Sequence, residues 1–239
     1  IKGTQLADMF LHTIYAASKE EYGYFIDGVY LHLRDGELRV VASDGRRLAI
    51  SKQELESPWD GEVSAIIPVK AAKVFTHAFG YLGVETPVYI GEEGVTFEYE
   101  DRLLYTRRVD AEYPDYESII PTDHRVRMRI GSSEMLDAVK RVSLLTDRNL
   151  MIVMEISNGK LRLSAASPDF GQAEETLEVE HEGEIKIAFN ARYVMDVLGH
   201  CGAWELIWEF RSEEEPALIR PAEDEQCSEL HLLMPMRME

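Results

Sequence analysis

Residues 24–44 read YFIDGVYLHLRDGELRVVASD, two runs of alternating apolar and polar residues that are joined by an Asp-Gly pair at residues 35–36. Residues 151–167 read MIVMEISNGKLRLSAAS and repeat this arrangement around an Asn-Gly pair at residues 158–159. Both pairs are typical of a two-residue hairpin turn, because their residues accept positive φ. The two stretches therefore predict two antiparallel β-hairpins, with their turns 123 residues apart.

The repeat continues beyond the hairpins. Pro68 precedes a helix that we expect at residues 69–82, and Asn190, which lies 122 residues later, precedes one that we expect at residues 191–201. Proline and asparagine are both favourable at a helix start. The constant offset indicates two copies of one structural unit.

Each copy is also expected to open with a helix, placed by apolar residues at helical spacing. The first is predicted at residues 4–17 with Thr4 as its cap, and the second at residues 133–146 with Ser132 or Ser133 as its cap. Later strands are expected at 93–100 and 206–210. Alternation with a period of two residues indicates a strand in both stretches.

The pattern predicts the α+β class, with tandem repeated domains whose helices lie on one face of antiparallel sheets. The turn-rich stretch at residues 121–124 divides the chain into expected domains 1–124 and 125–239.

Composition is that of a globular protein, with 45% hydrophobic and 29% charged residues. No apolar stretch approaches the roughly 18 residues of a membrane helix. The two cysteines and seven histidines show no metal-ligand spacing, so we expect no metal and no cofactor. The net charge of −19 is unfavourable for binding nucleic acid, although one basic face can coexist with an acidic surface.

Four short strings resemble those of the bacterial DNA sliding clamp, the beta subunit of DNA polymerase III. They are Ser43-Asp44-Gly45-Arg46-Arg47-Leu48-Ala49, Tyr113-Pro114-Asp115-Tyr116, Phe189-Asn190-Ala191-Arg192-Tyr193-Val194 and Leu233-Met234-Pro235-Met236-Arg237-Met238. Their order and spacing match the middle and C-terminal domains of that family, and the family's N-terminal domain has no counterpart in this sequence.

The resemblance implies the DNA clamp fold and a non-catalytic processivity factor. Members of the family form a homodimeric ring that encircles double-stranded DNA without reading its sequence. They bind replicative and translesion DNA polymerases, the clamp loader, mismatch-repair proteins and ligase through short peptide motifs. The implied location is the cytoplasm, at the nucleoid, without contact to a membrane.

The resemblance also implies a pocket for partner peptides, built from residues of both domains. By matching position these are Ile26, Ser43, Gly45, Arg46, Arg47, Leu48, Pro114, Ile119, Asn190, Tyr193, Leu232, Leu233, Met234, Pro235, Met236, Arg237 and Met238. Methionine and leucine suit an adaptable apolar groove. The alternative is that Leu233–Met236 form a final core strand. Arg46 stands where histidine is common in the family, and Ser118 stands where many members carry arginine.

The DNA-facing residues that the resemblance suggests are Lys70, Lys73, Lys140, Arg141 and Arg192. Basic side chains on helix faces contact phosphates without reading bases, as sliding requires. The alternative is that they are ordinary surface residues. The expected helix at 4–17 carries no lysine or arginine, which weakens the prediction of a basic lining.

Two other functions are alternatives to a sliding clamp. An acidic hydrolase would need two carboxylates, such as Asp44 and Asp115, converging in one cleft, and no nucleophile motif accompanies them. Cys201 beside His200 is better explained as a buried small residue than as a nucleophile. The second alternative is an isolated peptide-binding module, and we expect this chain by itself to bind clamp-motif peptides without stably encircling DNA.

Overall fold

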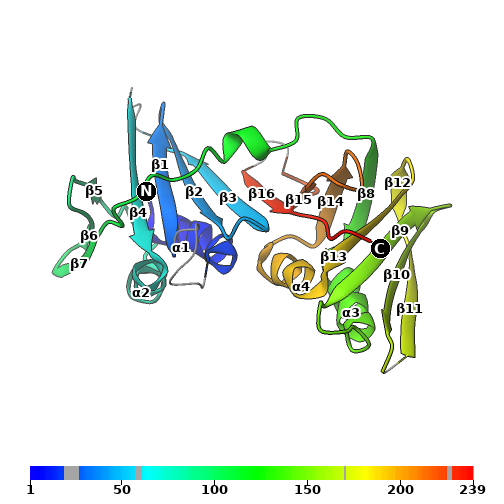
Figure 1. Ribbon diagram of the computed structural model, residues 1–239. Coiled ribbons are helices and arrows are strands. Elements are labelled where there is room, and N and C mark those ends of the chain that lie inside the picture. Colours follow the sequence, from blue (N-terminus) through cyan, green and yellow to red (C-terminus); the bar gives the residue numbers. More distant parts are fainter. Residues whose placement is uncertain (19–26, 57–60, 170, 225–227, 239) are drawn as a thin grey trace. The chain divides into compact units, whose positions relative to one another are not determined.

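The structure is a computed structural model that describes residues 1–18, 27–56, 61–169, 171–224 and 228–238. The chain divides into two compact units, Ile1–Tyr116 and Glu117–Glu239, and each is described by itself (Figure 1). Residues between Tyr116 and the first long strand of the second unit include only a short helical turn, η2 (Glu117–Ile119). The domain limits at residue 124 stay a prediction.

The first unit begins with helix α1 (Gly3–Leu11) and the turn η1 (Ile14–Ala16). Its main sheet has the antiparallel order β3-β2-β1-β4. The strands are β1 (Gly28–Arg34), β2 (Glu37–Ser43), β3 (Arg47–Glu54) and β4 (Glu62–Pro68), followed by helix α2 (Val69–Phe79). A smaller sheet follows, formed by β5 (Val88–Ile90), β6 (Gly94–Tyr99) and β7 (Arg102–Arg107).

The second unit has the same plan. After β8 (Val126–Gly131) and α3 (Ser132–Ser143), a four-stranded sheet has the order β11-β10-β9-β13. Its strands are β9 (Met151–Ser157), β10 (Lys160–Ser167), β11 (Gly171–Glu178) and β13 (Ile185–Asn190), and α4 (Ala191–His200) follows β13. A second sheet joins β12 (Glu180–Glu182), β8, β14 (Glu205–Phe210), β15 (Ala217–Pro221) and β16 (Glu229–Leu233).

Both predicted hairpins are confirmed. Asp35 and Gly36 have φ of 51° and 82°, and Asn158 and Gly159 have φ of 52° and 75°. Strand pairing on either side of each turn is antiparallel and in register. The local turn chemistry therefore sets the centre of each four-stranded sheet.

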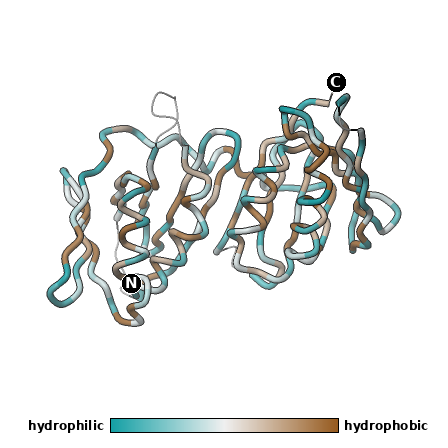
Figure 2. Tube along the Cα trace, turned by 90° about the horizontal axis from the view of Figure 1, so that it is seen from below, coloured by the Kyte–Doolittle hydropathy of each residue, from teal (hydrophilic) through white to brown (hydrophobic). Residues whose placement is uncertain are grey.

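The helices pack in pairs on one side of the sheets, α1 with α2 and α3 with α4 (Figure 1). Apolar side chains of each pair face the sheet. In the first unit the ring of Phe75 on α2 lies 4.7 Å from that of Phe97 on β6, centroid to centroid. In the second unit α3 buries Met135, Ala138, Val139 and Val142. Figure 2 shows apolar and polar positions alternating along the trace of each unit. The predicted α+β class is confirmed.

Several helix starts and ends differ from the sequence prediction. Helix α2 ends at Phe79 rather than at residue 82, α3 at Ser143 rather than at 146, and α4 at His200 rather than at 201. The helix predicted at 4–17 ends at Leu11, where the Thr13 hydroxyl donates to the Met9 carbonyl at 2.8 Å and the chain continues as η1. Its N-cap is Lys2 rather than Thr4, because the Gln5 side chain accepts the Lys2 N–H.

The predicted serine caps of the second opening helix are also wrong. The cap of α3 is Gly131. Ser132 lies inside the helix, and its hydroxyl donates to the Leu198 carbonyl on α4 at 3.4 Å. The predicted cap Asn190 is confirmed, since its side chain accepts the Arg192 N–H at 2.9 Å.

Candidate peptide-binding and nucleic-acid-facing residues

A tight turn joins β2 to β3 and carries the first group of predicted pocket residues. The Asp44 carboxylate accepts the backbone N–H groups of Arg46 and Arg47 at 3.0 and 3.1 Å. Gly45 has φ of 78°, and the Ser43 hydroxyl donates to the Arg47 carbonyl at 2.8 Å. The sequence thus folds into a turn that is fixed by its own side chains.

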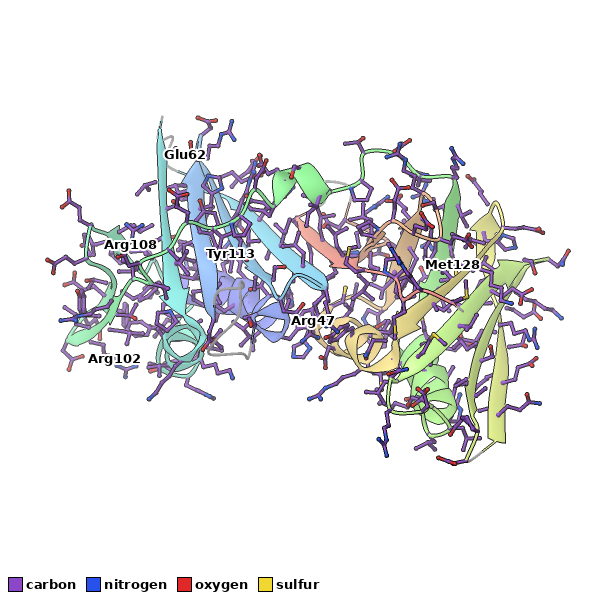
Figure 3. All side chains as sticks on the ribbon, in the orientation of Figure 1. Arg47, Glu62, Arg102, Arg108, Tyr113 and Met128 are labelled. Atoms are coloured by element: carbon purple, nitrogen blue, oxygen red, sulfur yellow. The ribbon has the colours of Figure 1, made fainter. Side chains whose placement is uncertain are left out.

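Arg47 points back into the first unit. Its Nε donates to Asp44 Oδ2 at 3.0 Å, and its guanidinium carbon lies 5.4 Å from the centroid of the Tyr15 ring (Figure 3). Arg47 and Leu48 are buried, whereas Arg46 is exposed. Of these three side chains, only that of Arg46 is therefore open to a partner at this turn.

The segment around Pro114 is held on the main sheet of the first unit by aromatic residues. Tyr113 stacks on Tyr30 with ring centroids 4.5 Å apart and an angle of 2° between the rings. His32 on β1 makes hydrogen bonds with the Tyr116 hydroxyl at 3.0 Å and with Glu62 at 2.8 Å. These contacts leave Pro114 exposed on the outside of the segment.

The Tyr113 hydroxyl is buried and has no hydrogen-bond partner among the described residues. Burial, together with the neighbouring Tyr116 and Tyr30, raises the pKa of Tyr113 above its ordinary value. Two further residues of the predicted pocket are Ile119 and Ile26. Ile119 is exposed on η2 in the second unit, and Ile26 lies outside the described residues.

The C-terminal segment carries the largest group of predicted pocket residues. Leu232 and Leu233 are buried on β16, so this part matches the core-strand alternative. Met234 and Met238 are 43% and 37% exposed, and Met236 is held by its N–H, which donates to the Ala188 carbonyl at 2.7 Å. A surface hollow of about 720 Å³ is lined by Glu213, Glu214, Met234, Pro235, Met236, Arg237 and Met238.

Two further predicted pocket residues lie at the start of α4. Asn190 caps the helix and also donates from its side chain to the Asn149 carbonyl at 3.4 Å. Tyr193 is half-buried on the first turn of the same helix. Asn190 therefore has a structural role in addition to any contact with a partner.

The predicted DNA-facing residues of the first unit share one face of α2. Lys70, Lys73 and His77 are exposed, while Ala72 and Phe75 are buried on the opposite face. Within the described residues, neither lysine forms an ion pair. Both charges are thus available to a phosphate.

The basic residues of the second unit are less available. Arg141 forms a two-point ion pair with Glu175 on β11, with Nε at 2.9 Å from Oε2. The hydrogen bond with Arg141 lowers the pKa of Glu175. Lys140 lies 3.5 Å from Asp137. Arg192, which follows the cap of α4, is exposed.

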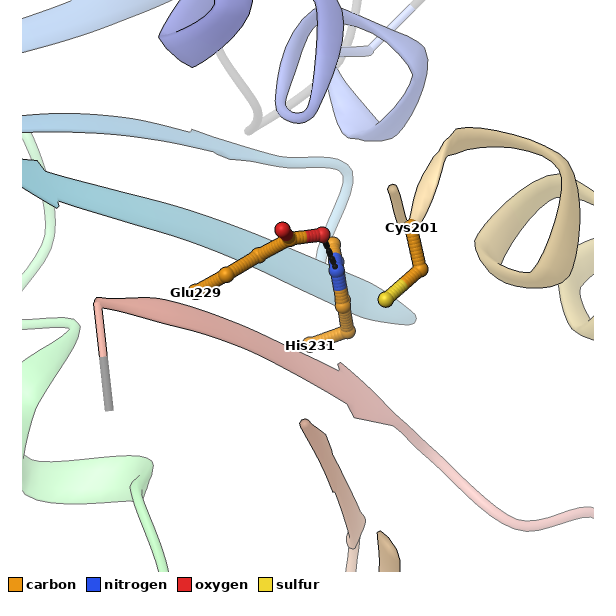
Figure 4. Close-up of side chains that lie close together, drawn as sticks. All are labelled: Cys201, Glu229 and His231. Atoms are coloured by element: carbon orange, nitrogen blue, oxygen red, sulfur yellow. Dashed lines mark hydrogen bonds and ion pairs between the residues drawn. The ribbon is translucent and has the colours of Figure 1, made fainter. Parts of the chain in front are cut away.

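A cluster that the sequence analysis missed lies where α4 ends. Cys201, Glu229 and His231 are all buried, and one potential ligand atom from each lies within 4.8 Å of the other two (Figure 4). His231 Nε2 is 2.7 Å from Glu229 Oε1. Burial raises the pKa of the Cys201 thiol well above its ordinary value, and the charge of Glu229 adds to this.

The signal for this cluster is present in the sequence but weak. Glu229 and His231 are two residues apart on β16, so their side chains leave the same face of the strand. Cys201, however, is 28 residues earlier and joins them only through the fold. Cys201 is buried, as predicted. The neighbouring His200 is exposed, and its Nδ1 lies 2.7 Å from the carbonyl oxygen of Asp196.

The carboxylates of the hydrolase alternative have other roles. Asp44 is occupied by Arg47 and by two backbone N–H groups, and Asp115 is exposed on the Pro114 segment.

Over the described part of the chain, no helix has the length and apolar character to cross a membrane.

Two tandem α+β units, each with paired helices on one side of antiparallel sheets, define a protein of the sliding-clamp fold class. Family models agree: the DNA polymerase III beta subunit central domain matches residues 1–115, and the C-terminal domain of the same subunit matches residues 117–237. The chain belongs to the DNA polymerase III beta subunit family.

The curated relatives and solved structures carry matching names. The beta sliding clamp of Pseudomonas aeruginosa is 27% identical over 100% of this chain and 65% of its own length. The DNA polymerase III beta subunit of Thermotoga maritima has a TM-score of 0.93 at 29% identity, covering 100% of this chain and 65% of that one. The Pseudomonas aeruginosa clamp bound to griselimycin has a TM-score of 0.95 at 26% identity, covering 100% and 64%. The chain thus spans less than two thirds of these proteins.

Proposed function

We propose that this chain acts as part of a processivity factor, which holds the bacterial replicative DNA polymerase on duplex DNA without catalysing a reaction itself. The observation that carries the proposal is the match of two consecutive family domains over nearly the whole chain. In this proposal the working form is a homodimeric ring that slides on DNA at the nucleoid, in the cytoplasm. Partners are polymerases, the clamp loader and repair proteins that carry short peptide motifs.

The peptide-binding part of the proposal is supported by the hollow along residues 234–238. Exposed methionines are unusual because burying them is favourable, and a flexible thioether adapts to different apolar partners. Arg237 is exposed beside them, while Glu213 and Glu214 line the same hollow. An extended peptide with apolar anchors and a polar backbone fits this combination. The turn between β2 and β3 carries the first group of predicted pocket residues. Its exposed Arg46 side chain can contact a polar group of the peptide.

The DNA-binding part is supported by Lys70 and Lys73 on α2 and by Arg192 on α4. These side chains are exposed and lack ion pairs with any described acidic residue, so each can release a counterion from a phosphate. Arg141 and Lys140 contribute less, because Glu175 and Asp137 already neutralise them. The net charge of −19 means that the rest of the surface repels DNA phosphates. Binding to DNA therefore stays weak outside these residues, as sliding requires.

Primer extension tests the proposed function. The whole gene product is added to the replicative polymerase and clamp loader of the same organism on a primed circular template. The expected result is a shift to much longer products, which is lost when the template is linear with free ends. Product lengths that do not change on the circle would contradict the proposal.

A charge-reversal pair tests the DNA-facing residues separately. Lys70→Glu with Lys73→Glu is expected to shorten the products most strongly at low salt. The difference from the unchanged chain should shrink as salt rises, because salt screens the same phosphate contacts that the variant has lost. Lys160→Glu with Lys186→Glu, two exposed lysines on β10 and β13, is the control matched for net charge and should have little effect. Equal losses in both variants would contradict a role specific to α2.

A further inference from the structure

The Cys201, Glu229 and His231 cluster lies outside every group of residues that the proposed function uses. Cys201 follows the last turn of α4, with its N–H donating to the Val197 carbonyl at 2.9 Å. Glu229 and His231 come from β16, and the first residue of this strand is held by a hydrogen bond from its backbone N–H. There, Asp224 Oδ2 accepts the Glu229 N–H at 2.9 Å. The three side chains are thus positioned by backbone on two separate elements.

We propose that these three side chains form a binding site for a single transition-metal ion of the zinc type, with Cys201 Sγ, a Glu229 carboxylate oxygen and a His231 ring nitrogen as ligands. The potential ligand atoms already lie within 4.8 Å of one another. Ligands around tetrahedral zinc are separated by roughly 3.3–3.8 Å, given bond lengths of about 2.0–2.3 Å. Side-chain movements of about 1 Å therefore complete the geometry.

Charge balance supports a divalent cation. A thiolate, a carboxylate and a neutral imidazole together carry two negative charges, which one divalent ion cancels. Burying two such charges without a cation is costly. When the metal binds, the Cys201 Sγ–H bond breaks and its proton leaves to solvent. The proton in the hydrogen bond between His231 Nε2 and Glu229 Oε1 moves to His231 Nδ1, so the imidazole stays neutral and both atoms can bind the metal.

The ligand chemistry selects the kind of metal. Thiolate and imidazole favour zinc and cobalt, whereas magnesium and calcium prefer a shell made entirely of oxygen ligands. Three protein ligands also leave one tetrahedral position for water or another group.

Cobalt(II) is the probe, because a cobalt–thiolate bond gives a near-ultraviolet charge-transfer band. The purified full chain, reduced and freed of metal by chelation, is titrated with cobalt(II) and then with zinc(II). The expected result is one cobalt per chain with a thiolate band, which zinc removes by displacement. Zinc should also raise the unfolding temperature in a concentration-dependent way.

Cys201→Ser is the decisive variant, because it removes the thiolate with little change of volume. It should abolish the thiolate band and weaken zinc binding at least tenfold. Glu229→Gln should weaken binding as well while keeping the band at high cobalt. His200→Ala removes an exposed histidine next to the site and is the matched control, which should bind as the unchanged chain does. Circular dichroism verifies that each variant is folded.

Three outcomes would overturn the proposal. The first is the absence of both a thiolate band and a zinc-dependent rise in unfolding temperature at millimolar metal. The second is a band that persists in folded Cys201→Ser, which would place the metal on another thiol. The third is zinc binding that is lost equally in His200→Ala, which would indicate a surface site.

Discussion

Arg47 Nε lies 3.0 Å from Asp44 Oδ2, and the side chains of both residues are largely removed from solvent, at 4% and 17% exposure. The same carboxylate accepts two backbone N–H groups of the turn. A buried guanidinium without its partner carries a large desolvation cost. The pair therefore fixes the turn between β2 and β3 and the position of the exposed Arg46 side chain.

Asp44→Ala is expected to lower the free energy of unfolding by about 1.5–3 kcal/mol, because it removes the charged hydrogen bond to the buried Arg47 guanidinium and the acceptor of two backbone N–H groups in the turn. Urea denaturation measures the change. Asp137→Ala, which removes an exposed partner of Lys140, is the control and should have little effect. If the two variants lose the same small amount of stability, Arg47 is not held as the structure describes.

Gly183→Ala is expected to destabilise the chain more than Gly159→Ala, although both glycines have φ of 75°. A Cβ at Gly159 meets nothing within 4 Å, so only the backbone penalty of about 1–2 kcal/mol applies. A Cβ at Gly183 would lie 2.6 Å from the Arg125 carbonyl oxygen, which adds a steric cost. Thermal unfolding of the two variants measures the difference, and equal effects would contradict the register of β12 on β8.

Asn190→Ala is expected to cost about 1 kcal/mol by removing the N-cap of α4. Asn190→Asp retains an acceptor for the Arg192 N–H but loses the side-chain donation to the Asn149 carbonyl, so it should recover part of the loss. Denaturation midpoints of the two variants are compared. An alanine variant as stable as the unchanged chain would mean that the cap is not formed.

Tyr113→Phe should leave stability unchanged or raise it near neutral pH, because the buried hydroxyl has no partner among the described residues. The pKa of Tyr113 is raised in the folded chain, so the stability tied to its proton is fully present below the unfolded value of 10.0 and is lost as pH rises beyond it. The unchanged chain should therefore lose more stability above pH 10.0 than Tyr113→Phe.

Tyr105→Phe is the control for this pH series, since Tyr105 is 51% exposed. It should follow the unchanged chain at every pH. The account of Tyr113 is wrong if all three proteins lose stability in parallel above pH 10.0.

The parts of the fold that the sequence predicted are those set by neighbouring residues. Positive φ at Asp35 and Asn158 follows from the turn pairs themselves, and the cap at Asn190 follows from its own side chain. The helix after Lys2 was harder to delimit, because its end depends on the Thr13 hydroxyl bonding back to Met9. Competition of this kind is not visible in apolar spacing.

The candidate sites depend more on contacts between distant residues. Matching strings identified Met234 and Arg46, which are exposed, but also Leu233 and Arg47, which are buried. Pattern alone does not separate these cases, because burial arises from packing between elements. The cysteine cluster at the end of α4 was missed for the same reason, since Cys201 reaches β16 only in the folded unit.

Calorimetric titration with a peptide of the Q-x-x-[LM]-x-F type tests the central claim most directly. Met234→Ala with Met238→Ala removes exposed side chains of the hollow without creating a buried cavity, and Leu144→Ala, at 78% exposure, is the matched control. Leu48→Ala is less useful, because Leu48 is 1% exposed and its loss would destabilise the unit by about 2–5 kcal/mol. We expect micromolar binding that the double variant weakens at least tenfold and the control retains. Absence of binding heat and of competition at high peptide concentration, or equal binding by all three proteins, would contradict a peptide site at the C-terminal segment.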